Sequence, residues 1–267
     1  MAEILKIDKI EDIKNFNDDN IVCAISVISE FWDVHSCAII KNAIPIGVGL
    51  SSNPYDAKLK ALDCNPVEAI GETIAFSKEI DKSAAQSLSK MNFSTIIATQ
   101  INKDAKKYLE KSRSKIIELG FRLDVYKKTI NEQENTDLTP KGFKVATKLK
   151  PTQEQVEDMV FAWKVSKHTR SNSAVVVKDL KTVGICQGET ARVDAIEKAL
   201  DRACENSKDA VLVTDGFLSS AEGIQAAIQA RIAGIIQPGL KDKQLIKTAD
   251  KYELVVITTG IRQFRNQ

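Results

Sequence analysis

Short apolar segments alternate with stretches of helical periodicity along this chain, and that alternation most constrains its fold. The segments are rich in β-branched residues and are bordered by Gly, Pro, Asn or Asp, which favours buried strands over buried helices. They span residues 37–50, 94–98, 173–179, 209–215, 233–239 and 252–260. Strands that alternate with helices in this way indicate an α/β fold around a mostly parallel or mixed sheet.

Helical periodicity is clearest in three stretches, residues 192–204, 220–232 and 242–251. In the first of them the apolar residues recur on one stripe, and the acidic residues face the other way. Thr152 is a candidate N-cap for a further helix that begins near Gln153.

The two halves of the chain resemble each other. Each has a helix, an apolar strand that carries one lysine (Lys41 or Lys178), a turn and a second helix. The turns are expected at glycines, namely Gly47 and Gly49 in the first half and Gly184 and Gly188 in the second. Between the halves, the polar stretch 131–142 lacks apolar periodicity and is the best candidate for a linker. We therefore predict a tandem duplication of an α/β/α unit, with domains at 1–140 and 141–267.

Composition argues against several classes of function. The formal net charge is only +2, from 38 Lys and Arg against 36 Asp and Glu, so we expect no nucleic-acid partner. Five widely spaced cysteines and two histidines do not fit a zinc site or a disulfide framework. No apolar run approaches a membrane span, and the first residues alternate acids with bases, so we expect a cytosolic protein without membrane contact.

Two segments near the centre of the second half are candidates for ligand contact. Residues 161–172 place several cations and Asn172 directly before a predicted strand, where a side chain opens onto a crevice; the alternative is a solvated helix C-terminus. Residues 184–195 form a turn that leads into a helix N-terminus. That turn suits an anion, or it is a plain connection between strand and helix.

Three loop residues and one strand lysine are further candidates. Phe217, Glu222 and Arg262 follow the ends of predicted strands, where an aromatic ring can stack on a heterocycle and an arginine can bind phosphate. Packing or surface roles are the alternative for each. Lys41 lies within an apolar strand, where loss of hydration would depress its pKa, unless its stem carries the ammonium to the surface.

Longer motifs carry a family resemblance. The second half reads FAWKVSKHTRSNSAVVVKD (161–179), TVGICQGETARVDAIEKAL (182–200), DAVLVTDGFLSSAEGIQAA (209–227), AGIIQPG (233–239) and TGIRQFRNQ (259–267). The first half contributes CAIIKNAIPIGVGL (37–50) and NPVEAIGETIAFSKEID (65–81). In order and spacing, these segments resemble the AICAR transformylase domain of the bifunctional purine-biosynthesis family AICAR transformylase/IMP cyclohydrolase. The resemblance is to a shortened and diverged member without the cyclohydrolase domain.

The resemblance implies a fold and a reaction. The fold would be two tandem cytidine-deaminase-like α/β/α subdomains without zinc. The reaction would be formyl transfer from 10-formyltetrahydrofolate, a co-substrate, to the amino group of an aminoimidazole carboxamide ribonucleotide in de novo purine biosynthesis. It also implies a homodimer in which each subunit contributes part of a site, and no metal.

The resemblance also assigns roles to individual residues. Lys41 corresponds to the family's active-site lysine, Asn172 to an asparagine at a strand mouth, and Gly71 to a glycine beside the substrate. Phe217 corresponds to the aromatic residue on the imidazole ring and Arg262 to a phosphate-binding arginine. The residues implied to face the folate are Glu222, Pro238 and Gly239.

One departure from the family pattern bears on the chemistry. The family's catalytic motif is Lys-His followed by Pro, whereas this chain has Lys41-Asn42 and then Pro45. Asparagine has no group that titrates near neutral pH, so Asn42 cannot serve as a base. The family's Arg-Tyr-Gly phosphate segment also has no counterpart before Lys41. The alternatives to a formyltransferase are therefore a non-catalytic or regulatory homologue that binds the nucleotide, the folate or a partner subunit, and an enzyme of altered specificity.

Overall fold

A computed structural model describes residues 3–131, 142–218, 221–239 and 243–263. It has a mixed α/β fold and divides into two compact units, Met1–Asn135 and Thr136–Gln267. Residues 132–141, which include most of the expected linker, lie outside the described residues, so the boundary near residue 140 stays a prediction.

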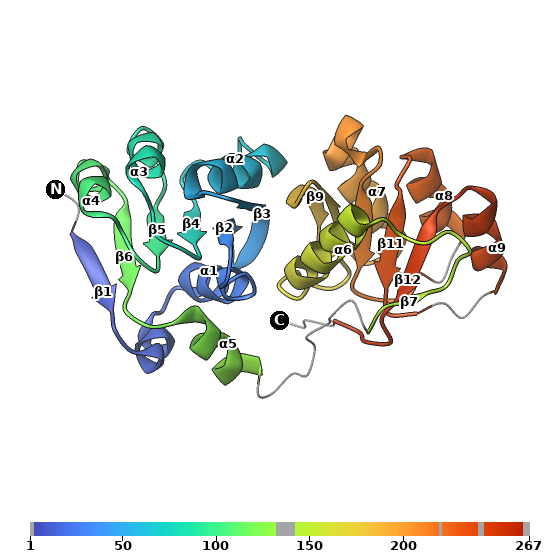
Figure 1. The fold of residues 1–267 in the computed structure, drawn as a ribbon, viewed down its shortest axis with the longest axis horizontal. Coiled ribbons are helices and arrows are strands. Elements are labelled where there is room, and N and C mark those ends of the chain that lie inside the picture. The colour runs from blue at the N-terminus through green and yellow to red at the C-terminus, as the bar shows by residue number, and fades with distance from the viewer. Residues whose placement is uncertain (1–2, 132–141, 219–220, 240–242, 264–267) are drawn as a thin grey trace. The chain divides into compact units, whose positions relative to one another are not determined.

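The first unit is a mixed sheet between helices (Figure 1). Its strands are β1 (Ile4–Ile7), β2 (His35–Lys41), β3 (Ile44–Ser51), β4 (Thr73–Phe76), β5 (Thr95–Ala98) and β6 (Lys115–Leu119). Its helices are α1 (Asp19–Ser29), α2 (Pro54–Cys64), α3 (Lys82–Leu88), α4 (Lys103–Leu109) and α5 (Leu123–Asn131), with a 3-10 turn, η1, at Ile10–Asn15. The order is β1-β6-β5-β4-β2-β3, in which β1, β6, β5 and β4 are mutually parallel and β2 is antiparallel to both neighbours.

The second unit repeats this plan. Its strands are β7 (Lys144–Val145), β8 (Ala174–Lys178), β9 (Lys181–Cys186), β10 (Val211–Thr214), β11 (Gly234–Gln237) and β12 (Val255–Thr258). Its helices are α6 (Gln153–Ser166), α7 (Arg192–Ala203), α8 (Ala221–Gln229) and α9 (Lys243–Lys251), with a 3-10 turn, η3, at Cys204–Ser207. The order β9-β8-β10-β11-β12 matches β3-β2-β4-β5-β6 with the same parallel and antiparallel pairings, so the two units share one strand plan.

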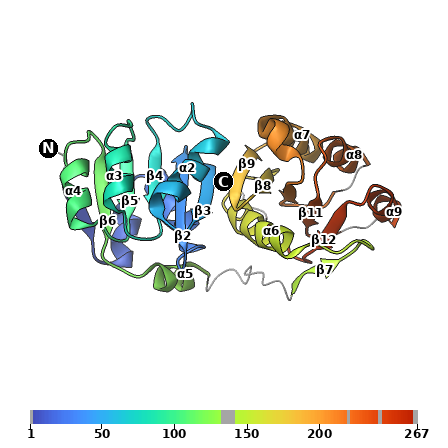
Figure 2. The same ribbon diagram turned by 45° about the horizontal axis from the view of Figure 1, so that its top comes forward.

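Each unit buries its own core between sheet and helices (Figure 2). In the first unit α2, α3 and α4 pack over β2, β4, β5 and β6 through small and branched side chains. In the second, α7, α8 and α9 pack over β8, β10, β11 and β12 in the same way. Helices α1 and α6 lie against β2 and β4 and against β8 and β10 respectively. The result is an α/β/α layering in each unit, as predicted.

The structure corrects the prediction for residues 37–50. This segment is a hairpin of β2 and β3, not one strand, and the chain turns at Asn42 and Ala43, whose φ angles are 52° and 60°. The second unit turns in the same way at Asp179 and Leu180, with φ angles of 55° and 56°. Two successive positive φ angles are typical of the tight hairpin turns that match the twist of the strands.

The glycines expected at the turns have another role. Gly47 and Gly49 lie in β3, and Gly184 lies in β9; only Gly188 occupies a turn, with φ 73°. A Cβ at Gly47 would lie 2.1 Å from the Ala61 carbonyl oxygen of α2, and a Cβ at Gly184 would lie 2.1 Å from the Ala199 carbonyl oxygen of α7. These glycines therefore let a helix approach the sheet closely.

The predicted helices agree with the structure within a few residues. Thr152 caps α6 in a capping box, because its hydroxyl accepts from the Gln155 N–H while the Gln155 side chain accepts from the Thr152 N–H. Among the described helices, none is both long and apolar enough to cross a membrane.

Candidate functional site

In the first unit, Lys41 stands at the end of β2 and faces two carboxylates. Its Nζ lies 2.5 Å from Glu68 Oε2 and 3.3 Å from Glu72 Oε1. The hydrogen bonds to Glu68 and Glu72 raise the pKa of Lys41 above its ordinary value. The depressed pKa expected from an apolar strand is therefore wrong, because the lysine stem carries the ammonium out of the sheet and into an ion pair.

Gly71 lies between the two residues that hold Lys41. It has a φ of 88°, and its N–H donates to the Asn92 carbonyl at 2.6 Å. A Cβ built at Gly71 would meet no atom within 4 Å, so the space beside this position is open. Asn42 follows Lys41 in the hairpin turn. The structure thus places Lys41 and Asn42 at one end of the hairpin, and Lys41 contacts the segment that carries Gly71.

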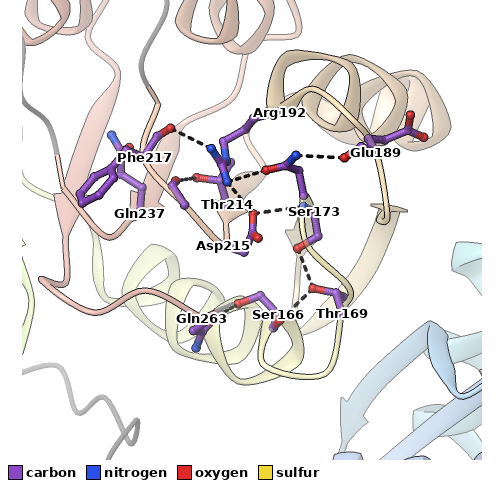
Figure 3. A network of polar contacts seen from close by, with 12 residues as sticks. Ser166, Thr169, Ser173, Glu189, Arg192, Thr214, Asp215, Phe217, Gln237 and Gln263 are labelled. Carbon is purple, nitrogen blue, oxygen red and sulfur yellow. Dashed lines mark hydrogen bonds and ion pairs between the residues drawn. The ribbon is translucent and has the colours of Figure 1, made fainter. Parts of the chain in front are cut away.

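In the second unit, a buried carboxylate and an arginine form the centre of a polar network (Figure 3). Asp215 follows β10 directly, and its side chain is fully buried. Its Oδ1 accepts from the Ser173 N–H at 3.1 Å and lies 3.5 Å from Nη2 of Arg192, the first residue of α7. Gly216 leaves room for the arginine, because a Cβ there would lie 2.2 Å from Arg192 Nη2.

Arg192 also joins two of the predicted site residues. Its Nη2 donates to Asn172 Oδ1 at 2.7 Å, and its Nη1 donates to the Phe217 carbonyl at 3.4 Å. The Asn172 amide nitrogen donates in turn to the Glu189 carbonyl at 2.9 Å. Among the described residues, the buried atoms Asp215 Oδ2 and Arg192 Nε have no hydrogen-bond partner, so the centre of the network retains one acceptor and one donor.

The Phe217 ring connects this centre to the ends of β11 and β12. The Arg262 guanidinium carbon lies 4.0 Å from the centroid of the ring, a cation–π contact. A Cβ at Gly239 would lie 3.0 Å from Phe217 Cε1, so the ring packs against that glycine. The Pro238 carbonyl accepts from the Gly260 N–H at 2.8 Å, which ties the two strand ends together. Phe217, Pro238, Gly239 and Arg262 are therefore neighbours.

Buried hydroxyl and amide groups form a further series of hydrogen bonds that leads to Asp215. Thr169 Oγ1 lies 2.7 Å from Ser173 Oγ and donates to the Ser166 carbonyl at 2.8 Å. The Ser166 hydroxyl donates to Gln263 Oε1, and the Gln263 N–H donates to the Asp215 carbonyl at 3.2 Å. These hydrogen bonds hold Gln263, the residue after Arg262, against the end of β10, where Asp215 lies.

One predicted residue of the second unit, Glu222, is not part of this network. Glu222 lies in the first turn of α8 and is exposed, and among the described residues it makes no ion pair with the cluster. Lys41, Asn42 and Gly71 belong to the first unit, whereas Asn172, Phe217, Pro238, Gly239 and Arg262 belong to the second. In the part of the chain that the structure describes, no group of His, Cys, Asp or Glu side chains is arranged to hold a metal ion.

Sequence reasoning missed the residues that organise both sites. Arg192 lies within the segment 184–195, which was expected to bind an anion through backbone N–H groups rather than through a side chain. Glu68 lies in a turn and Glu72 follows it, and no sequence motif marks that turn as part of a site. A usable signal existed for Asp215 only, since an acidic residue directly after a mainly apolar strand is expected at a strand mouth.

Comparison with known proteins identifies relatives of the chain. The family model described as "AICARFT/IMPCHase bienzyme" matches residues 13–202. A Caldicellulosiruptor saccharolyticus protein described as "Bifunctional purine biosynthesis protein PurH" is 36% identical over 91% of this chain and 50% of its own length. The protein of the same description from Acetivibrio thermocellus is 36% identical over 94% of this chain and 51% of its own length. The chain therefore spans about half the length of the curated relatives it matches.

A search of solved structures gives a weaker result. The structure described as "Acinetobacter baumannii RibD, form 2" matches with a TM-score of 0.31 and 13% identity, over 92% of this chain and 76% of that one. A TM-score this low carries no conclusion about the fold.

Proposed function

The chain belongs to the AICARFT/IMPCHase bienzyme family, and from that premise we propose that it transfers a formyl group from 10-formyltetrahydrofolate to an aminoimidazole carboxamide ribonucleotide. The acceptor is an aromatic amine with a phosphate, so a site for it needs an aromatic surface, a cation and donors for the carboxamide. The convergence of Phe217, Arg262, Asn172 and Arg192 at one end of the second unit is the observation that carries the proposal.

Each of these groups has a role that follows from its chemistry. Phe217 offers the imidazole the ring face that Arg262 does not cover, and Arg262 supplies a positive charge for the phosphate from over the other face. Arg192 holds Asn172 by its side-chain oxygen and thereby fixes the direction of the amide. The Asn172 amide nitrogen donates to the Glu189 and Thr190 carbonyls, so to bind the carboxamide or the developing oxyanion it exchanges one of these hydrogen bonds for the substrate. Pro238 and Gly239 form the rim beside Phe217, where with Glu222 we assign the folate.

In the first unit, Lys41 is proposed to act as a cation. Because its two carboxylate neighbours raise its pKa, Lys41 is protonated near neutral pH and donates hydrogen bonds. A protonated amine stabilises the negative charge that develops on the formyl oxygen when the acceptor nitrogen adds to it. Gly71, with open space beside it, leaves room for the substrate next to this group.

Several further features come with the family and are proposals for this chain. They are a cytosolic location, a homodimer whose subunits share sites, and two cytidine-deaminase-like subdomains with a boundary near residue 140. The cyclohydrolase activity that the family description names has no residues assigned to it here.

The test is a direct assay of formyl transfer with purified protein, the folate and the nucleotide. We expect transfer above the solvent rate, and we expect Arg262→Met to raise KM for the nucleotide about 10–100-fold, the equivalent of one charged hydrogen bond. Arg231→Met is the matched control, because Arg231 is an exposed arginine of the same unit that precedes β11 rather than following it. A rate indistinguishable from that of the solvent would overturn the proposal.

One observation favours a second candidate function, a homologue that binds the ligands without turnover. Asn42 occupies the motif position at which the family has a histidine, and it supplies no proton acceptor. Calorimetric titration with nucleotide or folate separates the two functions. Micromolar binding together with no turnover supports the binding protein, whereas turnover rules it out.

A further inference from the structure

We propose that Glu72 is the general base of the transfer reaction, in place of the group that Asn42 cannot supply. This inference rests on the proposed function and deepens it. The proposal stands on the geometry of the first unit alone, where Glu72 directly follows Gly71, which has open space beside it, and Glu72 Oε1 lies 3.3 Å from the Lys41 ammonium.

The chemistry requires a proton acceptor. The acceptor nitrogen adds to the formyl carbon, and the bond between that carbon and N10 of the folate breaks. In the balance the nitrogen loses one proton and N10 gains one. Once the nitrogen has added, its N–H is acidic, so a carboxylate is a sufficient base for the first transfer and a sufficient carboxylic acid for the second.

The two residues of the Lys41-Asn42 motif cannot take this proton. Lys41 is already protonated, since its hydrogen bonds with Glu68 and Glu72 raise its pKa. The Asn42 amide does not titrate near neutral pH. The groups that contact Lys41 in the described residues and accept protons are the carboxylates of Glu68 and Glu72.

Of these two carboxylates, Glu72 is better placed. It directly precedes β4, and its carbonyl accepts from the Ser94 N–H at 3.0 Å, so its backbone is fixed at the edge of the sheet. Its side chain is 20% exposed, against 53% for Glu68, which lies in the turn. Glu68 is also the nearer partner of the Lys41 ammonium, at 2.5 Å against 3.3 Å for Glu72, so its carboxylate is held more tightly in the ion pair.

Glu72 and Lys41 have separate roles in the transfer. Glu72 accepts the proton from the nitrogen, while Lys41 keeps its own protons and stabilises the oxyanion of the tetrahedral intermediate. When the carbon–N10 bond breaks, the proton on Glu72 passes to N10. The Glu72 carboxylate is then restored, and it forms its ion pair with Lys41 again.

The first experiment separates kcat from KM. We expect Glu72→Gln to lower kcat about 10²–10⁴-fold with KM for both substrates changed less than about threefold, because the amide keeps the shape but cannot take a proton. Glu68→Gln is expected to lower kcat less than about tenfold. Asp104→Asn is the control, since Asp104 is an exposed carboxylate paired with a lysine, Lys107, on α4 of the same unit.

The second experiment distinguishes a base from a residue that only positions Lys41. Acetate added to Glu72→Ala is expected to restore kcat at least about tenfold, because a free carboxylate can fill the space and accept the proton. Acetate should leave Glu72→Gln unchanged.

The outcomes separate this inference from the proposed function. Transfer by the wild-type protein together with a Glu72→Gln variant that keeps kcat within about threefold overturns the assignment of Glu72 and leaves the proposed function intact. A folded Glu72→Ala variant that acetate does not rescue also overturns it. Absence of transfer by the wild-type protein overturns the proposed function, and this inference with it.

Discussion

Two lysines of the first unit show how the groups that surround an ammonium determine its pKa. Lys41 extends from a strand end to two carboxylates, which raise its pKa. Lys58 lies on α2 and is only 1% exposed; it donates to the Ser87 hydroxyl and lies 4.5 Å from the Tyr55 ring centroid. Burial lowers the pKa of Lys58. The sequence placed only Lys41 in apolar surroundings, and the burial of Lys58 becomes visible only from the positions of its neighbours in the structure.

We predict that Lys58→Met stabilises the protein near neutral pH by about 1–3 kcal/mol, because methionine fills a similar space without a charge to bury. The folded state lowers the pKa of Lys58, so the unfolded chain binds its proton more tightly. The wild-type protein therefore gains stability as the pH rises from the folded pKa to the ordinary pKa, and the advantage of methionine should shrink.

Urea unfolding of both proteins at about pH 7 and about pH 10 measures this difference. Lys90→Met, at an exposed lysine of the same unit, serves as control and should change stability by less than about 0.5 kcal/mol at both pH values. A stability gain from Lys58→Met that stays constant with pH would show that Lys58 is not the titrating group.

In the second unit, the positive charge of Arg192 balances the negative charge of Asp215, whose side chain is fully buried. Removing the arginine leaves Asp215 buried without a cation, so we predict that Arg192→Met lowers the free energy of unfolding by about 3 kcal/mol. The double variant Arg192→Met, Asp215→Asn should lose less than the sum of the single changes. A double-mutant cycle in urea measures the coupling, and strict additivity would mean that the two side chains do not interact.

At the scale of elements, periodicity predicted the helices of the second unit but gave no range for the helices of the first. The helix that begins at Gln153 and the three predicted later in the chain all occur. Strand β6 contains two charged residues, Lys115 and Glu118, which interrupt its apolar pattern, and it was not predicted. The turn at Asn42 and Ala43 was missed because the turn itself contains no glycine and lies inside an otherwise apolar run. Contacts such as Lys41 with Glu68 join residues from separate elements, which no local pattern reports.

The close approach of helix to strand predicts the cost of adding one methyl group. Gly47→Ala and Gly184→Ala would each drive a Cβ into a helix backbone carbonyl, so each should cost more than about 2 kcal/mol in urea unfolding. Gly188→Ala is the matched control, because a Cβ there has open space and only the positive φ opposes it, at about 1 kcal/mol. Equal costs at all three positions would contradict close packing as the reason for these glycines.

At the scale of the whole molecule, one α/β/α plan occurs twice and carries a different polar cluster each time. In the first unit the cluster lies at the Lys41 end of the hairpin, and in the second it lies at the carboxyl ends of β10, β11 and β12. The duplication was predictable, because hydrophobic patterning repeats wherever a core repeats. The divergence of the two sites was not, because it depends on single residues such as Glu72 and Arg192.

The separate cores predict that the two units lose structure separately. Phe76 is 1% exposed and belongs to the core of the first unit, and Leu212 is fully buried in the core of the second. Phe76→Ala should cost about 3–5 kcal/mol and lower amide-exchange protection in β2, β4, β5 and β6, while protection in β8, β10, β11 and β12 stays as in the wild type. Leu212→Ala should give the reverse pattern. Equal loss of protection in both sets of strands after either change would mean that the two units unfold as one cooperative body.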